Sequence, residues 1–156
     1  MKELYRVEGT LNKSFIGQIT YTICLDKPYY EMDVHLTYDY AELRYSEDNL
    51  PPEVLEKTIR EVSDMSGYTI SEAEARKYLI YDIDLKTEIH PSATLNDQFI
   101  GCIHKQLCDR HMIYTKNYTS PGCIPQEKFE GVLKVTLSVF NIVKDNTRYT
   151  LSVSAQ

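Results

Sequence analysis

Apolar and polar residues alternate along several stretches of the chain, the pattern of half-buried β-strands. The alternation is cleanest over residues 30–40, where even positions are apolar and odd positions are polar. Residues 3–11 and 15–25 predict a β-hairpin joined through 12–14. Residues 133–139 and 149–153 predict a second, C-terminal hairpin that turns at 144–146.

Further short strands are expected between these two hairpins. The pattern predicts a strand over residues 82–95, a strand over 98–108 and a shorter one over 111–116. Residues 118–127 contain two prolines and a glycine, which predicts an irregular loop.

The middle of the chain changes to a helical period. Pro51 and Pro52 suit a first helical turn, an apolar stripe follows at helical spacing, and Gly67 is a typical stop. Ser71 and Glu74 have the spacing of a capping box, which predicts a second, shorter helix.

One ten-residue stretch occurs twice. Residues 10–19 and 94–103 share the pattern Thr-Leu-Asn-x-x-Phe-Ile-Gly-x-Ile, so seven of ten positions are identical. Such a repeat indicates two related halves, about 1–80 and 81–156, each built around this turn. Phe15 and Phe99 are then expected to be equivalent core anchors.

Together these patterns predict an α+β fold of one domain, residues 1–156. We expect a mainly antiparallel sheet, a meander or an open barrel, with a helical pair inserted between two halves that share one core.

Composition narrows the function classes. The net charge is −6 without any concentration of Lys and Arg, which argues against a nucleic-acid partner. No apolar run is long enough for a spanning helix and no export signal opens the chain, so we expect a cytoplasmic protein with no membrane partner and reduced thiols. Exposed edge strands would allow pairing between copies as a homo-oligomer.

Cysteine and histidine are densest at Cys102, His104, Cys108 and His111. On one strand rising about 3.3 Å per residue, Cys102 and Cys108 lie roughly 20 Å apart and cannot share an ion. Cys102 and His104 share a face and bind a metal only with a third ligand from elsewhere. We therefore predict no bound metal and no cofactor, and keep Cys102 and His104 as candidate ligand-binding residues.

A nucleophilic site is the alternative. The stretch 120–125, Ser-Pro-Gly-Cys-Ile-Pro, follows His104 and resembles the Ser/Thr-His-Gly-Cys-x-Arg segment of L,D-transpeptidases. The resemblance implies Cys123 as nucleophile and His104 as its base. Pro121 and Pro125 stand where that family has His and Arg.

Three other groups of polar residues have a structural and a functional interpretation. Asn12 and Asn96 at the repeated turns either cap the backbone or, if the turns lie side by side, form a ligand site. A row of carboxylates is expected to share one strand face and to be solvated: Asp82, Asp84 and Glu88. His35 is expected on the polar surface of its strand.

No complete catalytic constellation is present in the sequence. We therefore predict a non-enzymatic module that binds a small ligand or a protein of unknown identity. The alternative is a Cys/His-dependent hydrolase or transpeptidase-like enzyme centred on His104 and Cys123, with or without zinc.

Overall fold

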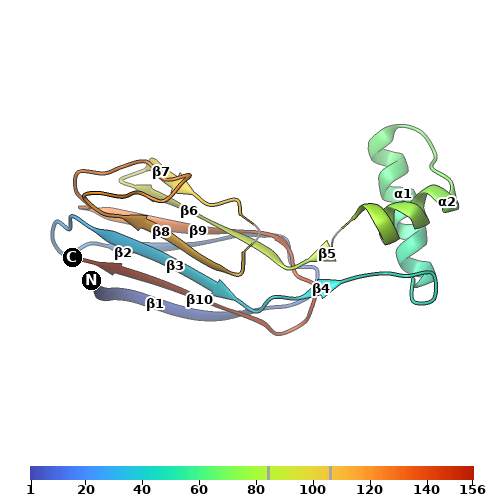
Figure 1. Cartoon of the computed structure of the whole chain (residues 1–156), viewed down its shortest axis with the longest axis horizontal. Helices are drawn as coiled ribbons and strands as arrows, with labels where there is room; N and C mark the ends of the chain where they lie inside the picture. The colour runs from blue at the N-terminus through green and yellow to red at the C-terminus, as the bar shows by residue number, and fades with distance from the viewer. Residues whose placement is uncertain (84, 106) are drawn as a thin grey trace. The chain divides into compact units, whose positions relative to one another are not determined.

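The computed structural model describes residues 1–83, 85–105 and 107–156. Over these residues it contains ten strands in antiparallel sheets and two α-helices, which confirms the predicted α+β class (Figure 1). The chain forms two compact units, one from residues 1–41 and 86–156 and the other from 42–85.

The first unit contains two open four-stranded antiparallel sheets that lie face to face (Figure 1). We name each sheet after a central strand. The β10 sheet has the order β1 (Lys2–Leu11), β10 (Thr147–Ala155), β3 (Met32–Tyr38) and β8 (Asp109–Tyr114). The β9 sheet has the order β2 (Gly17–Cys24), β9 (Val132–Asn141), β6 (Glu88–Leu95) and β7 (Gln98–Cys102).

The core of this unit lies between the two sheets. Met32, Val34 and Leu36 of β3 are fully buried, as are Leu133 and the next two alternate residues of β9. The intervening residues point outward and are polar, as the period of two predicts. Each sheet therefore has one apolar inner face and one polar outer face.

Both hairpins predicted at the ends of the sequence are wrong. β1 pairs with β10, and β2 pairs with β9, so the first two strands belong to different sheets. β9 and β10 are likewise consecutive in sequence but separated between the sheets. Their connections, residues 12–16 and 142–146, are long enough to cross the roughly 10 Å between packed sheets, so neither is a tight turn.

The two copies of the repeat adopt different structures. The second copy forms the β6–β7 hairpin, in which Asn96 and Asp97 have φ values of 50° and 65° and make a two-residue turn. The first copy crosses from one sheet to the other. Two related halves are therefore not confirmed, and Phe15 and Phe99, which are 39% and 52% exposed, are not core anchors. Phe15 lies in the segment that crosses between the sheets, and Phe99 lies on the outer face of β7, so both rings are exposed to solvent.

The second unit consists of the predicted helices between two short strands. Helix α1 (Pro52–Ser66) follows Pro51 and ends at Gly67, which is left-handed with φ 76°. Helix α2 (Glu72–Lys77) has the predicted capping box between Ser71 and Glu74 and continues into a π-helical segment (Tyr78–Asp82). Strands β4 (Glu42–Leu43) and β5 (Leu85–Lys86) pair with each other. This unit has a small core of its own, made of Leu55, Ile70, Ala75 and Leu79.

No helix in the described part of the chain has the length and apolar character needed to cross a membrane.

Candidate functional site

The four histidines of the chain form two pairs. His35 of β3 and His111 of β8 are direct partners in the register of the β10 sheet, and both point to its outer face. Their rings stack with centroids 3.7 Å apart and planes 10° from parallel. Both side chains are accessible, 31% and 41% exposed.

We call His35 and His111 the outer pair, and two carboxylates flank it. Asp109 Oδ1 lies 2.8 Å from His35 Nε2 and 3.6 Å from His111 Nε2. On the opposite side, Asp33 Oδ2 lies 2.9 Å from His111 Nδ1. One donor atom from each of His35, Asp109 and His111 lies within 4.8 Å of the others. Since imidazole and carboxylate are ligands for first-row transition metals, this arrangement is suited to holding one.

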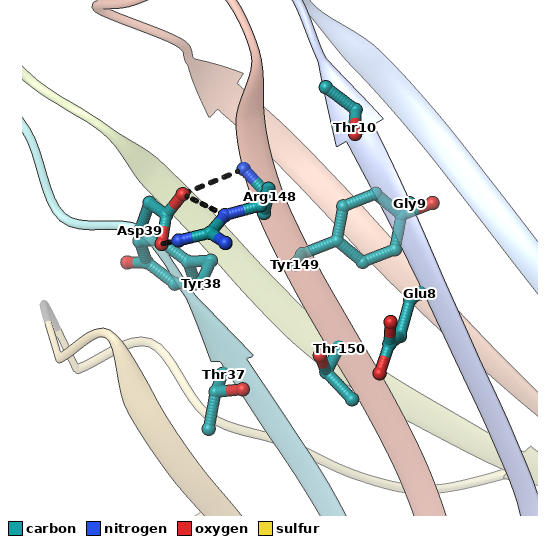
Figure 2. A pocket seen from close by; sticks show the side chains of 9 residues that line it. All are labelled: Glu8, Gly9, Thr10, Thr37, Tyr38, Asp39, Arg148, Tyr149 and Thr150. Atoms are coloured by element: carbon teal, nitrogen blue, oxygen red, sulfur yellow. Dashed lines mark hydrogen bonds and ion pairs between the residues drawn. The ribbon is translucent and has the colours of Figure 1, made fainter.

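A polar groove of about 470 Å³ lies on the same face of the β10 sheet (Figure 2). Thr37 lines it and is opposite Asp109 in the register, two residues from His35 on the same side of β3. Figure 2 shows Arg148 bound to Asp39 at one end of this groove, with Nε 3.0 Å from Oδ2. The histidine pair therefore adjoins a surface rich in hydroxyl and charged groups.

On the inner face of the same sheet, a glycine makes room for a tyrosine ring. The Tyr149 ring covers Gly9 of the neighbouring strand, and a β-carbon there would lie 2.3 Å from the tyrosine oxygen (Figure 2). The Tyr149 hydroxyl passes to the other sheet, where it lies 2.5 Å from that of Tyr21. Burial and this hydrogen bond raise the pKa of Tyr21.

The second pair, His90 and His104, is in a different environment, and we call it the inner pair. His90 is only 7% exposed and its Nδ1 lies 2.9 Å from His104 Nδ1. Phe140 covers its ring, with centroids 4.8 Å apart. Glu88 Oε1 lies 2.7 Å from His90 Nε2, but its direction is poor for a hydrogen bond.

Electrostatics favour the neutral form of this inner histidine. Burial lowers the pKa of His90 and the positive charge of Arg110 lowers it further, whereas Glu88 acts in the opposite direction. Arg110 is itself 2% exposed and donates to the Ile103 and Leu107 carbonyls and to the Tyr38 hydroxyl. His90 is thus built into the packing around β6 and β8, whereas its partner His104 is exposed.

The two residues of the predicted nucleophilic site have separate partners. His104 is hydrogen-bonded to His90, whereas the Cys123 thiol interacts with the Tyr114 hydroxyl. Burial raises the pKa of Cys123, and nearby Cys102 adds to this effect. A raised pKa disfavours the thiolate that a nucleophile needs. Cys123 also pairs with Gly101, where a β-carbon would lie 2.8 Å from its sulfur, so this cysteine has a packing role.

The other cysteines form no disulfide bond. All four cysteines of the chain are free, and Cys24 is exposed whereas Cys102 and Cys108 are partly buried. Cys102 lies opposite Ser92 in the β9 sheet. Of the dense stretch of cysteines and histidines, His111 lies beside two carboxylates, on the β10 sheet.

The two repeated asparagines are at opposite ends of β9. The Asn12 side-chain oxygen accepts a hydrogen bond from the backbone amide of Asn146, in the connection that follows β9. Asn96 accepts from the Val132 amide at 2.9 Å and donates to the Glu130 carbonyl at 2.8 Å, at the first residue of β9. Ten residues of strand separate these positions by about 30 Å, so the structure does not bring them into one site.

The predicted row of carboxylates is not a single strand face. Asp82 closes the π-helical segment and Glu88 begins β6 beside His90. Asp84 lies outside the described residues.

The larger hollow lies at one end of the two facing sheets. Its volume is about 970 Å³, and its walls come from residues 30–31, 115–119, 125–127 and 156. We call it the end groove. Tyr30 and Tyr118 line it and are 64% and 53% exposed. Glu31 and Glu127 supply two carboxylates against the single ammonium group of Lys116.

Sequence reasoning missed the outer histidine pair. It placed His35 on a polar strand face, which the structure confirms, and grouped His111 with Cys102 and Cys108. The available signal was that both histidines occupy outward positions beside an aspartate. Their direct pairing depends on the register between β3 and β8, which the sequence does not contain.

Comparison with family models matches residues 1–156 to a family of unknown function, DUF6669, and the chain belongs to that family. Searches of curated proteins and of solved structures gave no match.

Proposed function

Because membership of this family assigns no activity, we propose from the geometry that the protein is a non-enzymatic binding module whose end groove receives a basic segment of a partner polypeptide. The observation that carries this proposal is the pair of accessible tyrosine rings, Tyr30 and Tyr118, in a hollow of about 970 Å³. Solvent-exposed aromatic rings in a concave site are typical of ligand recognition.

The walls of the end groove are held in place before any ligand arrives. Glu31 accepts a hydrogen bond from Gln156 Nε2 at 2.5 Å, and the Thr115 hydroxyl is bonded to both the amide and the carbonyl of Tyr118 at 3.1 Å. A pre-formed site loses less entropy on binding than a mobile one.

Charge sets the class of ligand. The excess of carboxylates in the groove and the net charge of −6 attract cations, and a tyrosine ring binds guanidinium or ammonium groups through its face. Arginine or lysine side chains on an otherwise apolar peptide satisfy both features. Opposite charge also accelerates the encounter with such a partner.

The enzymatic alternative has weaker support. A hydrolase or transpeptidase-like reaction at His104 and Cys123 needs a thiolate beside its base, whereas burial raises the pKa of Cys123 and His104 is engaged with His90.

The proposal is tested with a fluorescein-labelled peptide of alternating arginine and leucine, titrated by fluorescence anisotropy against a matched glutamate–leucine peptide. We expect only the basic peptide to bind. Tyr30→Ala and Tyr118→Ala leave the net charge unchanged and should each weaken binding about 3- to 30-fold, since a cation–π contact contributes about 0.5–2 kcal/mol.

Tyr68→Ala is the matched control, because Tyr68 is 63% exposed and belongs to the helical unit. Its affinity should equal that of the unmodified protein. Equal losses in all three tyrosine variants, or binding of the acidic peptide, would refute the end groove as the site.

A further inference from the structure

We propose that His35, Asp109 and His111 bind a divalent first-row transition metal on the outer face of the β10 sheet. The proposal concerns a different surface from the end groove and does not depend on it. It rests on the placement of three donor atoms, on the orientation of one ring by a second carboxylate and on the accessibility of the cluster.

The donor atoms have nearly the spacing that a metal requires. Four ligands at about 2.1 Å from a tetrahedral ion are about 3.4 Å apart. Asp109 Oδ1 lies 2.8 Å from His35 Nε2 and 3.6 Å from His111 Nε2, values on either side of that distance. All three donor atoms lie within 4.8 Å of one another, so side-chain rotations that turn both ring edges towards one ion are required, while both strands keep their pairing.

Asp33 has the role of an outer-shell partner. Its carboxylate lies 2.9 Å from His111 Nδ1, so that nitrogen carries the proton and Nε2 offers its lone pair towards Asp109. Carboxylate–histidine–metal arrangements of this kind fix the ring and increase its basicity as a ligand. The direct strand pairing of His35 with His111 provides the second imidazole without any loop movement.

The stacked geometry disfavours a positive charge on both rings. Two imidazolium rings with centroids 3.7 Å apart would repel each other, whereas two neutral ligand rings can stack. A divalent ion also neutralises the two negative charges of Asp33 and Asp109 in one place.

The remaining coordination positions are accessible. Three protein ligands leave room for water or for oxygen atoms of a bound molecule. Asp109 is 66% exposed, and the neighbouring residue of the same face, Thr37, lines the polar groove of Figure 2. Zn²⁺ and Co²⁺ suit a site with two nitrogen donors and one oxygen donor.

The test is isothermal titration of the full chain with Zn²⁺, together with the visible absorption of the Co²⁺ form. We expect one ion per chain. His35→Ala and His111→Ala should each weaken binding by more than about 100-fold, because loss of an outer-shell partner alone costs about 10- to 100-fold. All substituted side chains point to solvent, and circular dichroism checks that each variant is folded. If either alanine variant is unfolded, Asp109→Asn replaces it with the same expectation.

His104→Ala is the matched control, because it removes a histidine that is exposed but belongs to the inner pair. It should leave the Zn²⁺ affinity unchanged. Loss of binding in His104→Ala with full binding in His35→Ala would overturn the assignment, and so would binding that survives in all variants, which would point to the thiols. Absence of Zn²⁺ binding by the unmodified protein would show that the cluster is only a pair of His–Asp contacts.

Discussion

The two histidine pairs use the same side chain for opposite purposes. In each pair the two histidine rings lie a few ångströms apart. A carboxylate also lies within 2.8 Å of a ring nitrogen in each case, Asp109 at the outer pair and Glu88 at the inner pair. The difference is burial. His35 and His111 lie on a solvated sheet face, whereas His90 is enclosed and its pKa is lowered. An accessible ring can exchange its contacts for a metal, but an enclosed ring is part of the packing.

The largest expected effect is a loss of folding stability when the inner pair is disrupted. His90→Ala removes a buried ring that contacts Phe140 and leaves His104 Nδ1 without its partner, so the free energy of unfolding should fall by about 2–4 kcal/mol. Urea denaturation measures it. If His90→Ala proved neutral, the inner pair would not be structural.

The next effect concerns the orientation of the outer pair. Asp33→Asn keeps the shape of the side chain but loses the charge beside His111, so the Zn²⁺ affinity should fall by about 10- to 100-fold. Calorimetric titration gives the value. Glu88→Gln is the corresponding change at the inner pair and should leave Zn²⁺ binding as it was.

The third effect is a pH dependence that belongs to His90. Its pKa is lower in the folded protein than in the unfolded chain, so the unfolded state takes up the proton first as the pH falls. Stability should decrease below the ordinary histidine pKa of about 6.5, by up to about 1.4 kcal/mol per pH unit, until the folded pKa is reached. Urea midpoints at pH 7.5 and 5.5 should differ less in His90→Gln. An unchanged difference would assign the dependence to another group.

The smallest effect is the stability of the outer pair without metal. His35→Ala removes an accessible contact with Asp109, for which surface ion pairs suggest a change of less than about 1 kcal/mol. Urea denaturation in the presence of a chelator measures it. A loss as large as that of His90→Ala would contradict the division into a surface pair and a structural pair.

The sequence predicted the local structure better than its assembly. Strand alternation, the start of α1 at the prolines, its end at Gly67 and the capping box at Ser71 all depend on neighbouring residues, and all are confirmed. Strand pairing depends on which connections cross between sheets. The repeat suggested the same turn twice, but only the Asn96–Asp97 copy makes a hairpin, because its two residues both have positive φ values.

The candidate sites show the same limit. The sequence drew attention to His104 and Cys123, which are close to other reactive residues along the chain but have separate partners in the fold. His35 and His111 are far apart in sequence, and the register of β3 against β8 makes them neighbours. The burial of a histidine could not be predicted from its sequence neighbours either, because His90 and His35 both occupy outward positions of their strands and only His90 is buried.

A single spectroscopic experiment tests the metal site most directly, because it observes all four histidines of the chain, and therefore both pairs, at once. Long-range ¹H–¹⁵N correlation spectra resolve both ring nitrogens of each histidine before and after one equivalent of Zn²⁺. We predict that the Nε2 signals of His35 and His111 shift to metal-bound values while those of His90 and His104 keep their positions. Shifts at His90 and His104 instead, or none at His35 and His111, would contradict the account.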